Sequence, residues 1–137
     1  MKIYNLEIRN LNNLIADVLD KFSSGTIILR GDLASGKTTF VKKFVEQLGI
    51  TGDVTSPTFS LQQCYGKDIF HYDIYNHGLE HFISLGMLEE LDKDGLHFVE
   101  WGDLKLEKIL LNAGMKVLVI EIKKISQNSR EYRVNYA

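Results

Sequence analysis

The stretch RGDLASGKTTF, residues 30–40, limits what this chain can fold into more than any other feature. Gly31, Gly36, Lys37 and Thr38 match the pattern G-x-x-x-x-G-K-[ST], which occurs where a buried strand passes through a glycine loop into a helix. The preceding residues, TIILR at 26–30, are short, apolar and β-branched, as expected for a central strand. Apolar residues then recur at helical spacing up to Gly49, namely Phe40, Val41, Phe44, Val45 and Leu48. This combination favours an α/β fold.

The chemistry of such a loop is specific. Its backbone N–H groups turn inward and form an anion site, and the N-terminus of the following helix adds partial positive charge. Lys37 is expected to reach the β- and γ-phosphates of a nucleotide, and the Thr38 hydroxyl is a hard oxygen ligand suited to Mg²⁺. The competing interpretation is a glycine turn that carries a lysine by accident. The flanking strand and helix favour a nucleoside triphosphate site.

The rest of the chain alternates between strand and helix patterns. We expect strands at 4–8, 59–65, 68–73 and 96–100, and helices at 11–22, with Asn10 as N-cap, at 79–91, interrupted by Gly86, and at 103–111. Residues 115–125 and 130–137 form an expected closing hairpin. The sequence therefore predicts one domain, 1–137, with a P-loop NTPase-like three-layer α/β fold, a mostly parallel central sheet and a C-terminal β-hairpin.

Composition narrows the class of protein further. Hydrophobic residues make up 45% and charged residues 25% of the chain, as in an ordinary soluble domain. The net charge of −2 disfavours a large direct contact with nucleic acid. A single cysteine, Cys64, an N-terminus without a signal-like apolar segment and the lack of a membrane-length apolar run together predict a cytoplasmic protein without membrane contact.

Two acidic residues follow apolar strand patterns downstream of the loop. Asp73 ends DIFHYD and Glu100 ends LHFVE, so both carboxylates are expected at the C-terminal edge of the sheet, where open α/β sheets bind ligands. A P-loop needs such an acid for Mg²⁺ or its water shell. A solvated strand-end acid is the alternative for either one alone.

A third element, VTSPTFSLQQCY at 54–65, surrounds Pro57 with hydroxyl side chains. Pro57 restricts its own backbone and that of Ser56, so a rigid loop could meet the γ-phosphate or its metal. An ordinary turn into a strand explains the same residues.

The segments GDLASGKTTF, SPTF, HYDIY and VEW, in this order and at these separations, resemble the TsaE (YjeE) family of small bacterial P-loop ATPases, required for N6-threonylcarbamoyladenosine in tRNA. The resemblance implies Mg²⁺ held by Thr38 and Glu100, and catalytic roles for Lys37, Asp73 and Glu100. It also implies nucleotide binding by the loop and two later residues: Gly31, Asp32, Leu33, Ala34, Ser35, Gly36, Lys37, Thr38, Thr39, Thr58 and Trp101. The implied partners are TsaD and TsaB, with ATP hydrolysis resetting their complex and tRNA contacted only through it.

The chain departs from the family pattern at three places. Ala34 and Ser35 stand where the usual loop, G-D-L-G-A-G-K-T, has glycine and alanine. The family often has arginine after D-L-Y, whereas here Asn76 follows DIY. Near the C-terminus, Ser129–Arg130 stands where the family commonly has Gly-Arg, and we expect Arg130 to be exposed to solvent.

Other classes of function can be weighed on the residues alone. A small-molecule kinase usually needs an arginine-bearing lid, whereas no arginine occurs between Arg30 and Arg130. A nucleotide-binding switch or scaffold with little turnover stays open, and a GTPase is disfavoured because N-K-x-D is absent. His71, His77 and His81 suggest zinc only weakly, and His71 is expected to be a structural imidazole. We expect hydrolysis to be slow until a partner completes the site.

Overall fold

The computed structural model describes residues 1–32, 34–50, 61–76 and 78–136. Its strands form one mixed sheet in the order β1-β7-β6-β2-β5-β4-β3. Strands β6, β2, β5 and β4 are mutually parallel, whereas β1, β7 and β3 run antiparallel to their neighbours. The strand bounds are β1 Lys2–Glu7, β2 Gly25–Arg30, β3 Gln62–Tyr65, β4 Ile69–Asp73, β5 Leu96–Glu100, β6 Val117–Lys124 and β7 Ser129–Tyr136.

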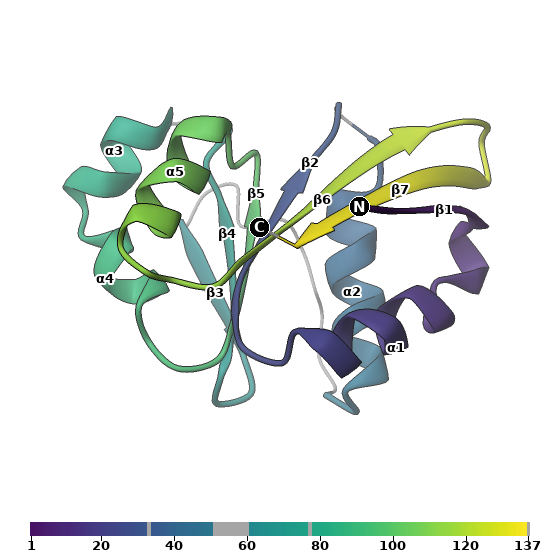
Figure 1. Ribbon diagram of the computed structural model, residues 1–137, viewed down its shortest axis with the longest axis horizontal. Coiled ribbons are helices and arrows are strands. Elements are labelled where there is room, and N and C mark those ends of the chain that lie inside the picture. Colours follow the sequence, from purple (N-terminus) through teal and green to yellow (C-terminus); the bar gives the residue numbers. More distant parts are fainter. Residues whose placement is uncertain (33, 51–60, 77, 137) are drawn as a thin grey trace.

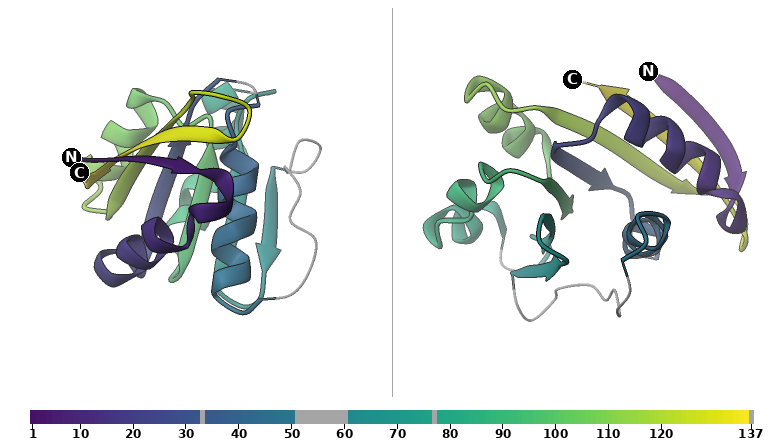
Figure 2. Two further views of the ribbon diagram at one scale, coloured as in Figure 1. Left: turned by 90° about the vertical axis from the view of Figure 1, so that its right-hand side faces the viewer. Right: turned by 90° about the horizontal axis from the view of Figure 1, so that it is seen from below.

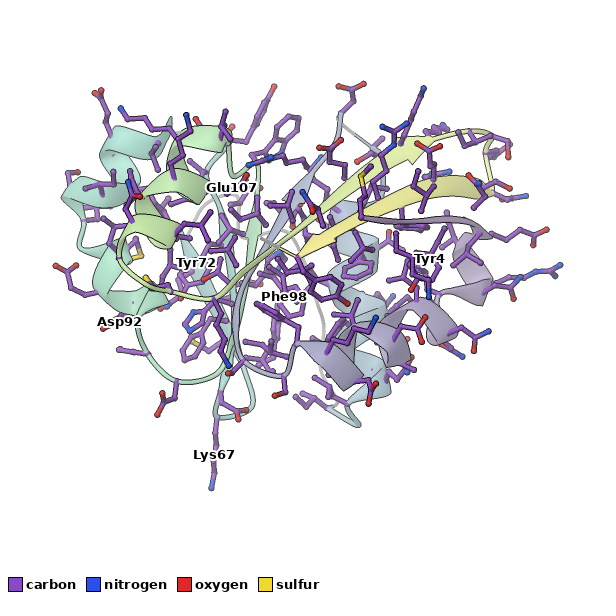
Figure 3. The ribbon with its side chains drawn as sticks, in the orientation of Figure 1. Tyr4, Lys67, Tyr72, Asp92, Phe98 and Glu107 are labelled. Carbon is purple, nitrogen blue, oxygen red and sulfur yellow. The ribbon has the colours of Figure 1, made fainter. Side chains whose placement is uncertain are left out.

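Helices cover both faces of this sheet (Figure 1). One face carries α1 (Asn12–Lys21) and α2 (Lys37–Gln47), and the other carries α3 (Gly78–Ser84), α4 (Met87–Leu91) and α5 (Leu104–Asn112). Each layer boundary has its own apolar core. Phe98 packs in the core beneath α2, while Tyr72 packs in the core beneath α5 (Figure 3). The expected three-layer α/β fold with a mostly parallel centre is confirmed.

The central strand follows from its sequence. Ile27, Ile28 and Leu29 of β2 are fully buried, because parallel neighbours flank the strand and helices cover both faces. The apolar stripe predicted after the glycine loop lies on α2 and is buried, except for Leu48, which follows the helix as its C-cap and is exposed. The end of β2 therefore delivers the loop to the edge of the sheet where β4 and β5 also end.

The start of α1 differs from the prediction. Asn10 is not its N-cap: Ile8–Asn10 form a 3₁₀ turn, and the cap position is Leu11, which makes no side-chain capping bond. The chain tightens into this turn directly from β1, so the helix begins later than the side-chain pattern indicates. Gly86, by contrast, separates α3 from α4 in the left-handed conformation, as the sequence predicts.

The predicted C-terminal hairpin is formed by β6 and β7, and β1 lies beside β7 at the edge of the sheet (Figure 2). None of the helices within the described ranges is long and apolar enough to cross a membrane.

Candidate nucleotide-binding site

The loop between β2 and α2 has the backbone that a phosphate-binding loop requires. Gly31 has φ +155° and Gly36 has φ +110°. A Cβ on Gly31 would lie 2.5 Å from the carbonyl oxygen of Ile122, so a side chain does not fit there. Gly36 is the N-cap of α2 and offers no side chain to the first N–H groups of the helix. These groups can therefore bind an anion.

Lys37 is held inside this loop. Its side chain is nearly buried, and its Nζ donates hydrogen bonds to the carbonyl oxygens of Gly31 at 2.7 Å and Asp32 at 2.9 Å. Burial lowers the pKa of the Lys37 ammonium, and the negative charges of Glu100 and Asp73 oppose that shift.

Thr38 and Glu100 form a direct contact at the C-terminal edge of the sheet. The Thr38 hydroxyl lies 3.0 Å from Oε1 and 2.9 Å from Oε2 of Glu100, a residue that is 3% exposed. The first turn of α2 and the end of β5 are thus brought together across 62 residues of sequence.

Asp73 ends the neighbouring strand, as predicted. It lies opposite Glu100 in the parallel register of β4 and β5. Its Oδ1 accepts a hydrogen bond of 2.9 Å from the backbone N–H of Tyr75. The two acids expected at this edge are therefore neighbours.

These residues line one pocket of about 570 Å³, in the size range of small-molecule sites. Its walls come from the loop and first turn of α2, the ends of β4 and β5, and β7: Ala34, Ser35, Gly36, Lys37, Thr38, Thr39, Asp73, Tyr75, Asn76, Glu100, Trp101 and Arg130. The pocket collects most of the site residues predicted from the sequence.

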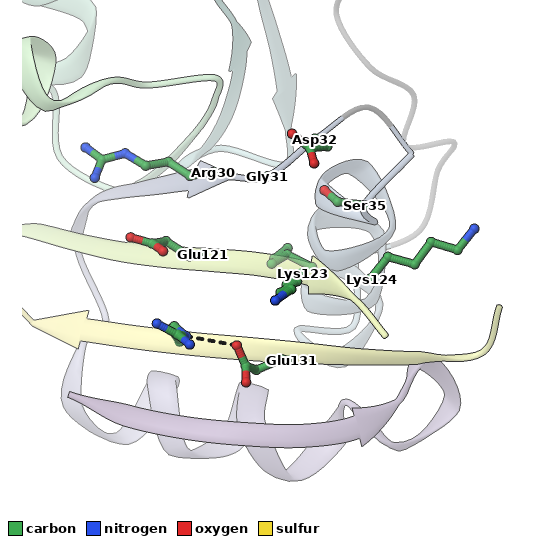
Figure 4. Close-up of a pocket in the computed structure, with 10 residues that line it drawn as sticks. Arg30, Gly31, Asp32, Ser35, Glu121, Lys123, Lys124 and Glu131 are labelled. Carbon is green, nitrogen blue, oxygen red and sulfur yellow. Dashed lines mark hydrogen bonds and ion pairs between the residues drawn. The ribbon is translucent and has the colours of Figure 1, made fainter. Parts of the chain in front are cut away.

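Gly31 and Asp32 do not line this pocket, although they were predicted to bind nucleotide. They line a neighbouring cavity of about 650 Å³ beside the exposed face of β6 and β7 (Figure 4). That cavity is the larger one, but its lining includes exposed charges of both signs, such as Glu121 and Lys123. Lys37, Thr38, Asp73 and Glu100 all lie at the smaller pocket, so the chemistry belongs there.

Comparison with known proteins agrees with this geometry. The profile of the family described as "Threonylcarbamoyl adenosine biosynthesis protein TsaE" matches residues 5–132. This chain belongs to the TsaE family. The Treponema pallidum (strain Nichols) protein of that name is 34% identical over 79% of each chain. The Bacillus subtilis (strain 168) protein is 38% identical over 77% of this chain and 65% of its own length.

A solved structure supports the fold. The crystal structure of Bacillus subtilis YdiB superposes with a TM-score of 0.68 at 28% identity, covering 98% of this chain and 86% of that one. TsaE proteins are named for the biosynthesis of threonylcarbamoyladenosine in tRNA, which agrees with the resemblance found in the sequence.

Two of the departures from the TsaE pattern, at Ala34 and Asn76, can now be placed. Ala34 has φ +60°, so a residue with a Cβ occupies a left-handed position where the family usually has glycine. Asn76 lines the pocket, so the amide stands at the site itself.

Arg130 was expected to be solvated, and that expectation is wrong. It is 6% exposed, because its guanidinium is surrounded by backbone carbonyl groups. Its Nε donates to the carbonyl oxygen of Ser35 at 2.7 Å. Its Nη1 donates to the carbonyl oxygens of Ser126 at 2.7 Å, Ser129 at 3.0 Å and Gln127 at 3.3 Å. Arg130 therefore ties the loop to the β6–β7 turn.

Two aromatic residues, Trp101 and Tyr75, line the pocket, and only Trp101 was identified from the sequence. Trp101 was predicted to lie on the nucleotide side, and its ring packs against that of Tyr75 with centroids 4.6 Å apart and planes tilted by 32°. Tyr75 itself was not singled out, although it belongs to the HYDIY motif. Its position two residues after Asp73, the acid at the end of β4, was the sequence signal that could have placed Tyr75 at the pocket.

His71 is buried and hydrogen-bonded, as expected of a structural imidazole. Its partner was not expected: Nε2 lies 2.5 Å from Oε2 of Glu100. His77 lies outside the described residues, and within the described ranges no group of three or more His, Cys, Asp or Glu side chains gathers as a metal site. The loop of Ser56, Pro57 and Thr58, and Leu33 of the P-loop, also lie outside them.

The side chains at the pocket fit Mg²⁺ and a triphosphate. A threonine hydroxyl and a carboxylate are the hard oxygen donors that Mg²⁺ prefers. Lys37 and the uncapped N-terminus of α2 supply positive charge on the same side. This donor set is able to hold a nucleotide with its metal ion.

Proposed function

We propose that this TsaE protein binds ATP with Mg²⁺ and hydrolyses it as a subunit that works with TsaB and TsaD in forming N6-threonylcarbamoyladenosine at tRNA position 37. The observation that carries the proposal is the contact between Thr38 and Glu100 directly beside Lys37 at the mouth of the P-loop.

Each residue has a role in this proposal. The N–H groups of the loop and the Lys37 ammonium bind the β- and γ-phosphates and neutralise the charge that develops during transfer. Thr38 and Glu100 hold the metal ion or its water shell. When bound there, Mg²⁺ would supply positive charge that offsets the charge of the phosphates. Asp73, next to Glu100 in the sheet, orients the attacking water.

The site is proposed to be completed by a partner. Arg130 is the one arginine among the described residues that line the pocket, and its Nε and Nη1 already donate to backbone carbonyl groups. It is therefore not available as a mobile cation for the γ-phosphate. An arginine supplied by a partner can raise turnover about 10³-fold or more. Slow hydrolysis by the isolated chain follows.

In this proposal ATP hydrolysis resets the TsaB–TsaD complex between cycles, and TsaD transfers the threonylcarbamoyl group. The net charge of −2 supports contact with tRNA through the complex. We place this activity in the cytoplasm, without membrane contact.

The test is a reconstituted modification assay with the organism's TsaB and TsaD, tRNA, ATP and Mg²⁺. With wild-type protein we expect many modified tRNAs per TsaD, and with Lys37→Ala about one round. Equal multiple turnover with both proteins, or without any TsaE, would overturn the proposed reset. A phosphorylated small-molecule product would indicate a kinase, and tight ATP binding without turnover would indicate a switch.

A further inference from the structure

The carboxylate of Glu100 has hydrogen-bonding partners on two sides. On the pocket side it meets the Thr38 hydroxyl. On the core side Oε2 meets Nε2 of His71, whose side chain is fully buried. Among the described residues these are the two side chains that hydrogen bond to Glu100. Both the pocket face and the core face of the acid are therefore occupied.

The direction of the buried bond can be assigned. A carboxylate accepts hydrogen bonds, so Nε2 of His71 is assigned as the donor. Nδ1, on the other side of the ring, lies 3.1 Å from the hydroxyl of Tyr65. Both ring nitrogens are thus engaged, and the imidazole is fixed in orientation between β3 and the end of β5.

The two contacts differ in what they become when a metal ion binds. Thr38 would share its oxygen with Mg²⁺, whereas His71 lies behind Glu100. His71 stands two residues before Asp73 on β4, so both side chains lie on the same face of the sheet. His71 therefore offers Glu100 a hydrogen bond that the metal does not compete for. A buried carboxylate without such a donor is costly and poorly oriented.

We infer that His71 is a positioning residue for the magnesium site, holding the Glu100 carboxylate toward Thr38 and the pocket. This inference rests on the proposed function, since it concerns the same metal ion. The HYDIY segment then has two roles: His71 contributes to metal affinity, and Asp73 is the acid at the end of β4.

The chain contains a matched control. His97 is equally buried, on the adjacent strand β5, but its nitrogens face Tyr72 and the carbonyl oxygen of Lys93. Replacing His97 therefore disturbs a buried imidazole without touching Glu100. Two variants of His71 separate donor position from burial. The amide of His71→Gln can donate near the position of Nε2, whereas that of His71→Asn ends near Nδ1.

The experiment measures the dissociation constant of ATP by calorimetry, with Mg²⁺ and with EDTA, for wild type, His71→Gln, His71→Asn and His97→Gln. The dissociation constant with EDTA divided by the one with Mg²⁺ gives the contribution of the metal ion to ATP affinity. We expect a large ratio for wild type and His97→Gln, a similar one for His71→Gln, and a reduction of about 10-fold or more for His71→Asn. Thermal unfolding of each variant verifies that it is folded.

Two results would overturn the inference, and they are distinguishable. If wild type shows a large ratio and His71→Asn shows the same one, His71 is structural and the proposed function stands. If wild type shows a ratio near one, the proposed magnesium site fails together with the inference.

Discussion

The ammonium of Lys37 lies 4.0 Å from the centroid of the Trp101 indole ring. The residue directly after Glu100 thus covers the residue that is proposed to bind the phosphates. Trp101 adopts φ +67°, which is rare for a residue with a bulky side chain, and its backbone N–H donates to the carbonyl oxygen of Leu29. Such backbone conformations occur at functional sites where the surrounding structure enforces them.

This contact makes Trp101, the single tryptophan, a reporter for the pocket. Phosphates that draw Lys37 away from the ring should change the indole emission, so we expect an ATP titration to saturate in wild type. Lys37→Ala should weaken binding about 10- to 100-fold, because one charge-assisted contact is lost. A fluorescence titration follows binding to wild type, and calorimetry compares wild type with Lys37→Ala, because the variant lacks the ammonium on which the fluorescence change depends. The prediction fails if Lys37→Ala titrates with the wild-type midpoint.

Thr38 can be tested with a closely matched pair of variants. Thr38→Ala removes the proposed metal ligand and the pocket-side donor to Glu100, so the Mg²⁺ concentration for half-maximal hydrolysis should rise about 10-fold or more. Thr38→Ser keeps the hydroxyl and should stay close to wild type. A magnesium titration of steady-state hydrolysis decides this, and equal behaviour of the alanine and serine variants would contradict the role given to the hydroxyl.

Ala34→Gly should stabilise the protein. Alanine in the left-handed region costs about 1–2 kcal/mol, of which the greater freedom of glycine in the unfolded chain offsets about 0.5–1 kcal/mol. Urea unfolding should give a net gain of about 0.5 kcal/mol. The control is Ala113→Gly at φ −83°, where only the entropic loss applies and stability should fall. A loss of stability in both variants would refute the strain at Ala34.

His97 should make the folded state sensitive to mild acid. Burial lowers its pKa, and the neutral ring is satisfied because Nε2 donates to the carbonyl oxygen of Lys93 and Nδ1 accepts from the Tyr72 hydroxyl. The unfolded chain, with a histidine pKa of about 6.5, then binds a proton that the folded state does not bind. Stability is therefore full above pH about 6.5 and is lost as the pH falls below it.

Urea unfolding of wild type and His97→Gln between about pH 5 and pH 8 measures this effect. We expect the wild-type free energy of unfolding to fall toward pH 5 with a steeper slope than that of the variant. The hydrogen bond to the backbone carbonyl group of Lys93 and the negative charge of Glu90 oppose the lowering of the His97 pKa by burial, whereas the positive charge of Lys93 adds to that lowering. Identical slopes would show that His97 does not carry the pH dependence.

The sequence predicts the parts of the site that local pattern determines. The glycine spacing, the apolar strand before it and the acids at two strand ends are sufficient to place Lys37, Thr38, Asp73 and Glu100 at one sheet edge. Strand order then makes Asp73 and Glu100 direct neighbours, because the parallel strands β4 and β5 are adjacent and end side by side.

What the sequence does not predict depends on contacts between distant segments. Arg130 reaches the loop across 95 residues, and nothing in its neighbours marks it as buried. His71 and Glu100 are 29 residues apart, and their contact depends on the packing of adjacent strands. Single side chains on a strand carry no signal of which distant group they face.

We propose that this TsaE protein is an ATPase whose site a partner completes, and one measurement tests this directly. We would measure Mg²⁺-dependent ATP hydrolysis by the purified chain, alone and with the organism's TsaB and TsaD, with Lys37→Ala as the blank. We expect slow hydrolysis by the isolated chain, a rise of about 10³-fold when TsaB and TsaD are added, and no hydrolysis by the blank. Strong hydrolysis by the isolated chain, unchanged by TsaB and TsaD, would contradict it.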